Sequence, residues 1–476
     1  MPSVRSRIFF LSTWLVILIL ISFYQYRRRF GTTPQRSLLL DHHLPFSCEG
    51  RWIHIYNLSD IYNENLVRNC STFKKPEDLC PYMENGGMGR AFTYEPEIFP
   101  VKSEGSVWFN SWQSSLELYF HERLLQYPCI APIESADMFY VPFYAGMDLS
   151  YSMTHRSVKK EAHYVELLTW LREQYFFTRR GGLDHFITLG RIALDFRRPR
   201  GDSWGTQMLL HPEFQNMVKL TVERDGGTPA FSKNEIAIPY PTYYHARSDR
   251  QVEDVVSWAL QSHQRSVFVA LAGIRKQRLG GIREKLMRDC ESDGRCTLLI
   301  CEGHEGVNQT DLDTRYPGNL PIAGHNLHTS CNYPSAPLDT FHRSQFCLQP
   351  PGDSPTRRSF FDALVAGCIP VIFKPTAAWT QYISFLPENG ESFSILIPFS
   401  KLRKDNVIDM LTRIPQTQIV AMRAKIGELL PRILYAHVAR KYPSTSGANG
   451  TVMENPDAFD LALVEVHNLM KRNEGK

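Results

Sequence analysis

The sequence predicts an α/β protein in which two arrays of parallel β-strands and helices follow one N-terminal membrane-spanning helix. Three observations support this prediction. Short, nearly continuous apolar segments alternate with segments of helical periodicity from about residue 48 to residue 420, a pattern typical of parallel βαβ units. The chain has 476 residues, more than one core usually holds. Residues 8–26 contain no charged side chain.

The N-terminal apolar segment is just long enough to cross a bilayer as a helix. It is longer than the apolar part of a usual cleaved signal peptide, and no small-residue cleavage site follows it. Basic residues flank it on both sides, so charge alone does not decide its orientation. We expect a cytosolic tail at 1–7, a transmembrane signal anchor at 8–26 and a stem at 27–47.

Cysteines and glycosylation motifs indicate the side of the membrane on which the rest of the chain lies. The chain has ten cysteines, an even and high number that suits disulfides in an oxidising lumen. A cytosolic domain with reduced thiols is the alternative. Four Asn-x-Ser/Thr motifs favour the lumen, and they begin at Asn57, Asn69, Asn308 and Asn449.

The first array is expected to form a domain over residues 48–249. Residues 71–107 carry many Pro, Gly and Glu residues and are expected to be irregular. Helical periodicity is present at 111–127 and 158–177. Apolar segments predict strands at 51–58, 137–143, 184–189 and 235–241.

The second array is expected to form a domain over 250–455, followed by a C-terminal helix within 456–476. Residues 302–334 are expected to form a loop-rich insertion. Strands are predicted at 266–273, 296–301, 344–350, 368–373 and 392–398. Helices are predicted at 252–261, 279–290, 355–366, 405–414, 416–435 and 456–472.

Composition excludes a nucleic-acid-binding protein. The net charge is only +4, and no run of basic residues interleaved with aromatics occurs outside the N-terminus. The cysteines show no Cys-x-x-Cys pair with zinc spacing. No Asp-x-Asp motif lies near a predicted strand end.

The segment 344–373 carries the most informative pattern. A predicted strand runs into Pro-Pro-Gly-Asp-Ser, and a helix is expected to start at once. Ser354 suits an N-cap and Pro355 the first helical position, while Gly367 stands where a glycine commonly ends a helix. A helix N-terminus at the carboxyl end of a parallel strand is a natural anion site.

Charged residues near this helix start support an anion site. Arg357 and Arg358 oppose the helix dipole unless an anion is present, and each can donate charge-assisted hydrogen bonds. Asp353 is expected to cap the loop or to accept from a substrate hydroxyl, beside Gly352. Asp362 has two interpretations: an ion pair with Arg358 four residues earlier, or an acceptor for a ribose.

The pattern FCLQPPGDS…RRSFFDALVAGCIPVIF resembles the exostosin-like glycosyltransferases of family 47. VPFYAGMD (141–148), GLDHFITLGRIALDFRR (182–198) and IAIPYPTYYH (236–245) resemble the plant xyloglucan galactosyltransferase branch of that family. The resemblance covers about residues 48–465. It implies a GT-B fold, in which two Rossmann-like domains face each other across a cleft, with the acceptor bound by the first and the nucleotide-sugar by the second. It also implies a Golgi membrane location. It further implies transfer without a bound metal or other cofactor, in agreement with the absence of an Asp-x-Asp motif near a predicted strand end.

The resemblance further implies an inverting transfer, in which a carboxylate takes the acceptor proton and basic groups stabilise the leaving diphosphate. Gly273, Arg275 and Lys276 are a second phosphate-binding candidate, although this chain reads LAGIRKQ where the branch reads closer to FAGAPRP. Tyr240, Tyr243 and Tyr244 are candidates for stacking on sugars or for core packing. The base candidates are Asp148, which also suits a loop cap, His185, which also suits a core histidine, and Asp195, which also suits a pair with Arg197 or Arg198.

The expected activity is transfer of galactose from UDP-galactose to xyloglucan side chains. The expected partners are the UDP-sugar, the polysaccharide, the membrane and other Golgi glycosyltransferases. A second possibility is another donor, UDP-galacturonic acid or an arabinose donor, or another wall polysaccharide. A third is a glycan-binding or scaffold protein that has lost catalysis, which the intact GDSPTRRSFFDA segment argues against.

Overall fold

The computed structural model divides the chain into two units, Met1–Phe46 and Ser47–Lys476, and the description below concerns the second. The expected cytosolic tail, membrane anchor and stem lie outside the described residues. Among the described residues, no helix combines the length and the apolar character needed to cross a membrane. The structure describes residues 48–73, 79–94, 107–155, 157–199, 204–225, 233–261, 265–274, 281–301, 327–329, 334–403, 405–442 and 453–474.

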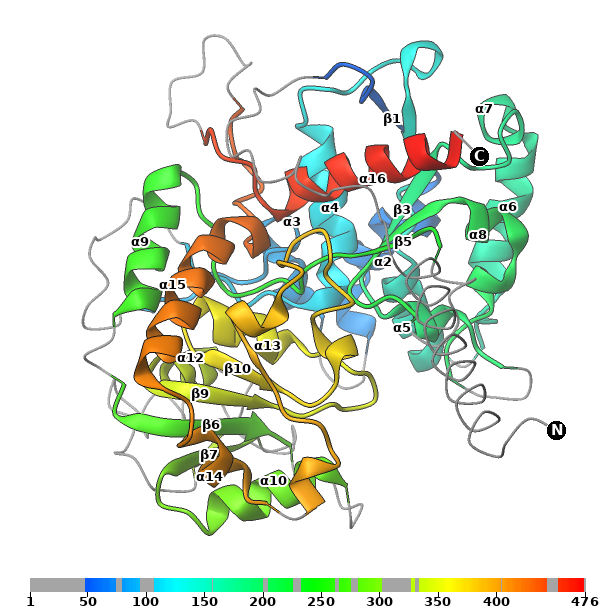
Figure 1. Ribbon diagram of the computed structural model, residues 1–476. Coiled ribbons are helices and arrows are strands. Elements are labelled where there is room, and N and C mark those ends of the chain that lie inside the picture. The colour runs from blue at the N-terminus through cyan, green and yellow to red at the C-terminus, as the bar shows by residue number, and fades with distance from the viewer. Residues whose placement is uncertain are drawn as a thin grey trace, which may run out of the picture. The chain divides into compact units, whose positions relative to one another are not determined.

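The first half of this unit contains a parallel sheet that has five strands in the described part of the chain (Figure 1). The strands are β1 (Ile53–Ile55), β2 (Met138–Tyr140), β3 (His185–Leu189), β4 (Val218–Thr221) and β5 (Glu235–Ala237), in this spatial order. Neighbours pair in parallel throughout. The parallel arrangement confirms the prediction. The strands, however, lie side by side in the order in which they occur in the chain, whereas the strand order of a Rossmann sheet reverses after its third strand.

Strand β4 was not predicted, because Lys219 interrupts its apolar pattern. Lys219 is nevertheless fully buried. Its ammonium group donates to the carbonyl of Gln215 at 2.8 Å, and burial lowers its pKa to about 7. The buried lysine therefore prevents β4 from being predicted by apolar periodicity alone.

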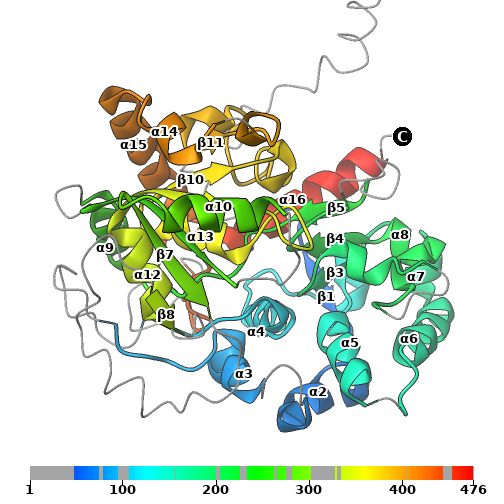
Figure 2. The ribbon, with the colours of Figure 1, turned by 90° about the horizontal axis from the view of Figure 1, so that it is seen from below.

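The second half contains a parallel sheet of six strands among the described residues, in the order β11-β10-β9-β6-β7-β8 (Figures 1 and 2). The strands are β6 (Val267–Gly273), β7 (Cys296–Cys301), β8 (Leu327–Thr329), β9 (Ser344–Gln349), β10 (Ile369–Ile372) and β11 (Ile395–Leu396). Read from β8, this is the doubly wound order 3-2-1-4-5-6 of a Rossmann sheet. Two departures from prediction are that β11 is shorter than 392–398 and that β8 lies inside the predicted insertion.

The helices include most of those predicted. The helices not predicted are α2, α3, α5, α8 and α12, of which α3 lies in the region expected to be irregular. The bounds are α2 (Glu64–Arg68), α3 (Cys80–Gly87), α4 (Leu116–Leu125), α5 (Ala145–Thr154), α6 (Ala162–Glu173), α7 (Tyr175–Thr178), α8 (Pro212–Asn216), α9 (Asp249–Leu260), α10 (Ile282–Glu291), α12 (Ser335–His342), α13 (Arg358–Val365), α14 (Val407–Leu411), α15 (Gln416–Ile433) and α16 (Ala458–Glu474).

The C-terminal helix α16 returns to the first half of the unit. It packs against β4 and β5 as well as against α15, and Figure 1 shows it in red beside the first sheet. The last helix therefore links the two halves.

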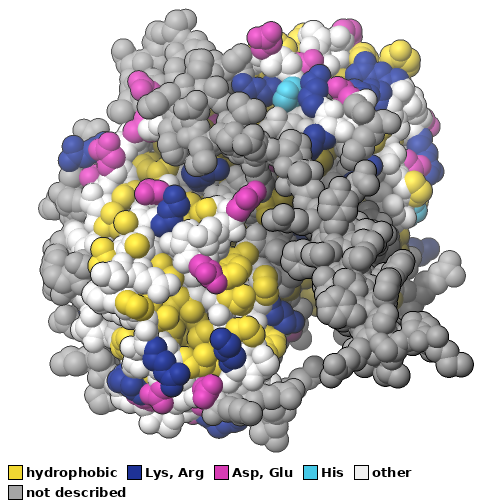
Figure 3. All heavy atoms as spheres, viewed as in Figure 1, with side chains coloured by type: hydrophobic (Ala, Val, Ile, Leu, Met, Phe, Trp, Pro, Cys, Tyr) yellow, Lys and Arg dark blue, Asp and Glu magenta, His cyan; other side chains and the backbone are white. Residues whose placement is uncertain are grey.

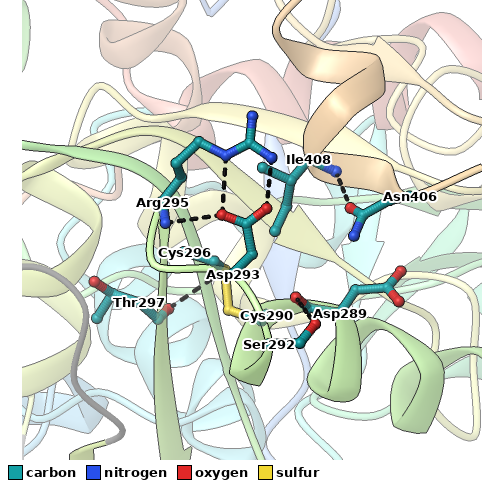
Figure 4. The surroundings of a disulfide bond; sticks show 9 residues. All are labelled: Asp289, Cys290, Ser292, Asp293, Arg295, Cys296, Thr297, Asn406 and Ile408. Carbon is teal, nitrogen blue, oxygen red and sulfur yellow. Dashed lines mark hydrogen bonds and ion pairs between the residues drawn. A yellow bond between two sulfur atoms is a disulfide. The ribbon is translucent and has the colours of Figure 1, made fainter.

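Disulfides confirm the expectation drawn from the cysteine number. Figure 4 shows one of them at the turn from α10 to β7, where the Asp293 carboxylate accepts from both the backbone and the side chain of Arg295. Another links β9 to the residue before β10 and so joins the two ends of the segment that contains α13. The disulfides within the described residues are Cys48–Cys129, Cys70–Cys80, Cys290–Cys296 and Cys347–Cys368.

Surface charge agrees with the small net charge. On the face shown in Figure 3, basic and acidic side chains are mixed over the described surface. This mixture is the opposite of the basic stripe that nucleic-acid binders present.

Candidate active site

The reversal of strand order in the second sheet locates the candidate site. Strands β6 and β9 are adjacent and parallel, with Ala270 opposite Cys347, and the chain continues to β7 on one side and β10 on the other. Ligands of doubly wound sheets bind beyond the carboxyl ends of the strands at such a switch point. The chain leaves this point at Gly273, the last residue of β6, and in the loop 350–357 after β9, which we call the donor loop.

Two arginines hold the first part of the donor loop. The Arg357 Nε donates to the carbonyl of Pro350 at 2.9 Å, and Arg283 of α10 donates to the carbonyl of Pro351 at 3.3 Å. The Arg357 guanidinium lies directly over Gly352, where an added Cβ would stand 1.2 Å from one of its nitrogens. Gly352 is thus required for this close approach.

The helix begins three residues later than predicted. Arg357, not Ser354, is the N-cap of α13, with extended φ and ψ of −153° and 155°. No side chain caps this N-terminus. Ser354 and Thr356 bond instead to a side chain from the first half of the unit, which holds the chain extended, and Pro355 disfavours helical geometry at the preceding residue. The predicted C-terminal glycine is confirmed: Gly367 has a φ of +66° and follows the C-cap, Ala366.

The electrostatics around Arg357 favour an anion. Burial, and then the neighbouring Arg283, lower the pKa of Arg357 to about 10. Burial also lowers the pKa of Arg283, against the opposing effect of the exposed Asp353. Two partly buried cations beside an uncapped helix N-terminus can bind a phosphate and stabilise a leaving diphosphate.

Arg358 makes different contacts. It donates to the carbonyl of Ser111, and its guanidinium carbon lies 3.7 Å from the centre of the Tyr243 ring. Its Nε is 3.4 Å from the carboxylate of Asp362, whose pKa burial raises to about 6. The predicted ion pair with Asp362 is present, and Asp362 is 4% exposed.

Glu223 is a residue that sequence reasoning missed. It follows β4 in the first half of the unit, and its carboxylate accepts from Tyr240, Ser354 and the backbone of Thr356. The one available signal was an acidic residue two positions past a strand, and that strand was itself hidden by Lys219.

The second phosphate-binding candidate is described only in part. Gly273 ends β6 at the same edge of the sheet as the donor loop. An added Cβ would make only an ordinary contact there, with Met287. Arg275 and Lys276 lie outside the described residues.

Asp148 lies in the first turn of α5, not in a loop as predicted. It hydrogen-bonds Nδ1 of His163, a partner that sequence reasoning did not find. Burial raises the pKa of Asp148, and the bond to Asp148 raises the pKa of His163. α5 follows β2, which is two strands from β4 in the first sheet.

The other two base candidates have defined partners. His185 is the first residue of β3, at the amino end of that strand. One of its ring nitrogens is 2.9 Å from the Tyr56 hydroxyl and the other is 2.7 Å from the carboxylate of Asp184. Its complete burial favours the core interpretation. The pairing suggested for Asp195 was wrong, because Arg191, 3.3 Å away, is its ionic partner.

Arg197 and Arg198 pair elsewhere, with Glu235 and Glu161 respectively. The three tyrosines considered for sugar stacking are each at most 6% exposed. Tyr240 donates to Glu223, Tyr243 lies under Arg358, and Tyr244 donates to the carbonyl of Gln251. Their contacts are those of packed residues.

Residues 47–413 match the family model of the exostosin GT47 domain. The chain belongs to the exostosin GT47 family. This GT47 protein is therefore a glycosyltransferase, as the resemblance predicted. It is 34% identical over 446 residues to an Arabidopsis thaliana protein named "Probable xyloglucan galactosyltransferase GT15", a match that spans 90% of this chain and 84% of the relative.

Two further Arabidopsis thaliana relatives differ in the sugar that their names specify. "Xyloglucan galactosyltransferase MUR3" is 33% identical, over 89% of this chain and 63% of the relative. "Xyloglucan-specific galacturonosyltransferase 1" is 34% identical, over 88% of this chain and 57% of the relative. Both names specify the same acceptor.

Proposed function

We propose that this GT47 protein transfers galactose from UDP-galactose to xyloglucan side chains, with inversion at the anomeric carbon. The observation that carries the proposal is the donor loop: a Gly-containing loop with two partly buried arginines at the switch point of a Rossmann-ordered sheet. The names of the relatives support xyloglucan as the acceptor. The alternative donor is UDP-galacturonic acid, because one relative is named for that transfer.

The proposed mechanism divides the work between the two halves of the unit in the manner of a GT-B enzyme. The donor diphosphate lies against Gly352, Arg357 and the N-terminus of α13, which stabilise the negative charge that develops on the leaving UDP. The acceptor binds over the first half. Asp148 and Asp195, which follow the carboxyl ends of β2 and β3, are the proposed base candidates for the acceptor hydroxyl.

A donor screen tests this proposal. The purified protein is incubated with a xyloglucan oligosaccharide and, separately, with UDP-galactose, UDP-galacturonic acid and a UDP-arabinose, and the products are weighed by mass spectrometry. The expected result is the addition of one hexose from UDP-galactose, with inverted anomeric configuration by NMR. UDP binding without transfer from any donor would instead indicate a glycan-binding or scaffold protein.

We expect transfer to continue at an unchanged rate in excess EDTA. The reason is the proposed use of arginines and a helix terminus to stabilise the diphosphate. Within the described part of the chain, His, Cys, Asp and Glu form no cluster that could hold a metal ion. Asp311 and Asp313, which form an Asp-x-Asp triplet in the predicted insertion, lie outside the described residues. Loss of transfer with EDTA, restored by Mn²⁺ and abolished by Asp311→Asn with Asp313→Asn, would contradict the prediction.

We propose that the chain is a type II Golgi membrane glycoprotein anchored by residues 8–26. The disulfides support a luminal domain, and Asn57 and Asn69 are both exposed, as a glycan requires. Asn308 and Asn449 lie outside the described residues. In intact microsomes we expect a C-terminal tag to resist added protease and the protein to lose mass with an N-glycosidase. Digestion of the tag without detergent would overturn this topology.

A further inference from the structure

Three consecutive residues after β4, Val222 to Arg224, form one of the contacts between the two halves of the unit. The backbone carbonyl of Val222 accepts from Tyr382 at 2.7 Å. The backbone N–H of Arg224 donates to the Gln381 side chain at 3.0 Å, and the same side chain donates back to the carbonyl of Arg224 at 3.1 Å. Glu223 lies between these two contacts and projects its carboxylate toward the donor loop.

The backbone of Glu223 is fixed within the first half. Its carbonyl accepts from the backbone of Ala193 at 2.9 Å and from the Thr221 hydroxyl at 3.0 Å. The residue is 2% exposed. Burial of a carboxylate costs free energy of folding unless hydrogen bonds compensate for the lost solvation. The hydrogen-bond partners of Glu223 therefore indicate its role.

Two of the three donors to this carboxylate belong to the donor loop. One oxygen accepts from the Ser354 hydroxyl at 2.7 Å and from Tyr240 at 2.7 Å, and the other accepts from the backbone N–H of Thr356 at 3.2 Å. Thr356 immediately precedes Arg357. The Glu223 charge also attracts the Arg357 guanidinium, while burial raises the pKa of Glu223 itself.

We propose that Glu223 is a positioning residue of the transfer reaction, which sets the conformation of the donor loop and so aims Arg357 at the donor diphosphate. The inference rests on the proposed function, since it assigns Glu223 a role at that same site. Glu223 does not contact the donor: it acts through Ser354 and Thr356. The first half of the unit thereby controls donor affinity across the contact between the halves.

The test is a set of steady-state measurements on the full-length protein. Glu223→Gln keeps an oxygen for Ser354 and Tyr240 but replaces the acceptor of the Thr356 N–H with an amide. We expect the KM for the UDP-sugar to rise at least about fivefold, and the KM for xyloglucan oligosaccharide to stay within about twofold. Ser354→Ala should raise the donor KM in the same direction.

Non-additivity separates positioning from a general loss of stability. Because both changes act through the same side chain on the same loop, the donor KM of the double variant should rise by less than the product of the two single effects. Tyr240→Phe is the matched control: it removes a donor to Glu223 that is outside the loop, and it should lower the melting temperature with the donor KM unchanged.

The outcomes are distinct. A Glu223→Gln protein that melts earlier but keeps the parental donor KM would overturn the inference. If that variant does not fold, Ser354→Ala decides, and an unchanged donor KM for it would likewise overturn the inference. A parent protein that transfers no sugar from any UDP donor would instead refute the proposed function.

Discussion

Replacing Arg357 by Ala is expected to slow sugar transfer more than tenfold and to weaken UDP binding to a similar degree, with little change in melting temperature. A charge-assisted hydrogen bond to a diphosphate is worth about 1.5–3 kcal/mol, which corresponds to a factor of ten or more. Arg357 lies over Gly352 at the N-terminus of α13, beside the cation of Arg283. Its removal relieves that repulsion, so we expect no large loss of stability.

The neighbouring arginine provides the matched control for Arg357. Arg358→Ala should mainly lower stability, because Arg358 is bound by Ser111, Tyr243 and Asp362. Arg357→Lys should restore only part of the transfer rate, since lysine lacks the planar fork that binds two phosphate oxygens. UDP affinity by calorimetry, turnover and thermal melting are measured for each variant. Parental affinity and turnover in both Ala variants would place the donor elsewhere.

Replacing Arg123 by Met is expected to cause the largest loss of stability. Arg123 is 1% exposed and donates to Tyr119 at 2.6 Å, to Asp457 at 2.7 Å and to Tyr442 at 2.7 Å. It joins α4 to the segment just before α16. Removing one partner of a buried ion pair leaves an uncompensated charge and costs about 3–5 kcal/mol.

That cost corresponds to a fall in melting temperature of about 4 °C for a unit of this length. Arg172→Ala is the control, because its pair with Glu213 is exposed, with side-chain accessibilities of 55% and 23%. Such pairs contribute about 0–1 kcal/mol, so its melting temperature should stay within about 1 °C of the parent. Equal shifts in the two variants would show that the Arg123 cluster contributes no more than a surface pair.

The parallel sheets could be predicted because short apolar segments alternate with helical segments along the chain. This pattern can be recognised within a few consecutive residues. The donor loop could be placed at a strand end for the same reason, and the glycine at 367 marks the end of α13 by its left-handed backbone. The failures in this region involve distant partners. Ser354 is not an N-cap, because its hydroxyl donates a hydrogen bond to Glu223, which is 131 residues away in sequence.

The roles of charged residues were harder to predict than the elements. Arg358 lies 247 residues from Ser111, and Arg123 lies 334 residues from Asp457. Nothing local distinguishes such residues from solvated charges. Lys219 caused a strand to be missed, because a charged side chain is rarely found in a fully buried strand. Packing between the halves decides the partners of Arg358 and Arg123.

Hydrogen–deuterium exchange of the purified protein, with and without saturating UDP, tests most directly the claim that the donor diphosphate binds at the donor loop. The amides of residues 352–359 should exchange more slowly when UDP is present, because the diphosphate accepts from the loop and from the first turn of α13. Slowed exchange confined to the first half of the unit, or no change across residues 344–373, would contradict the account.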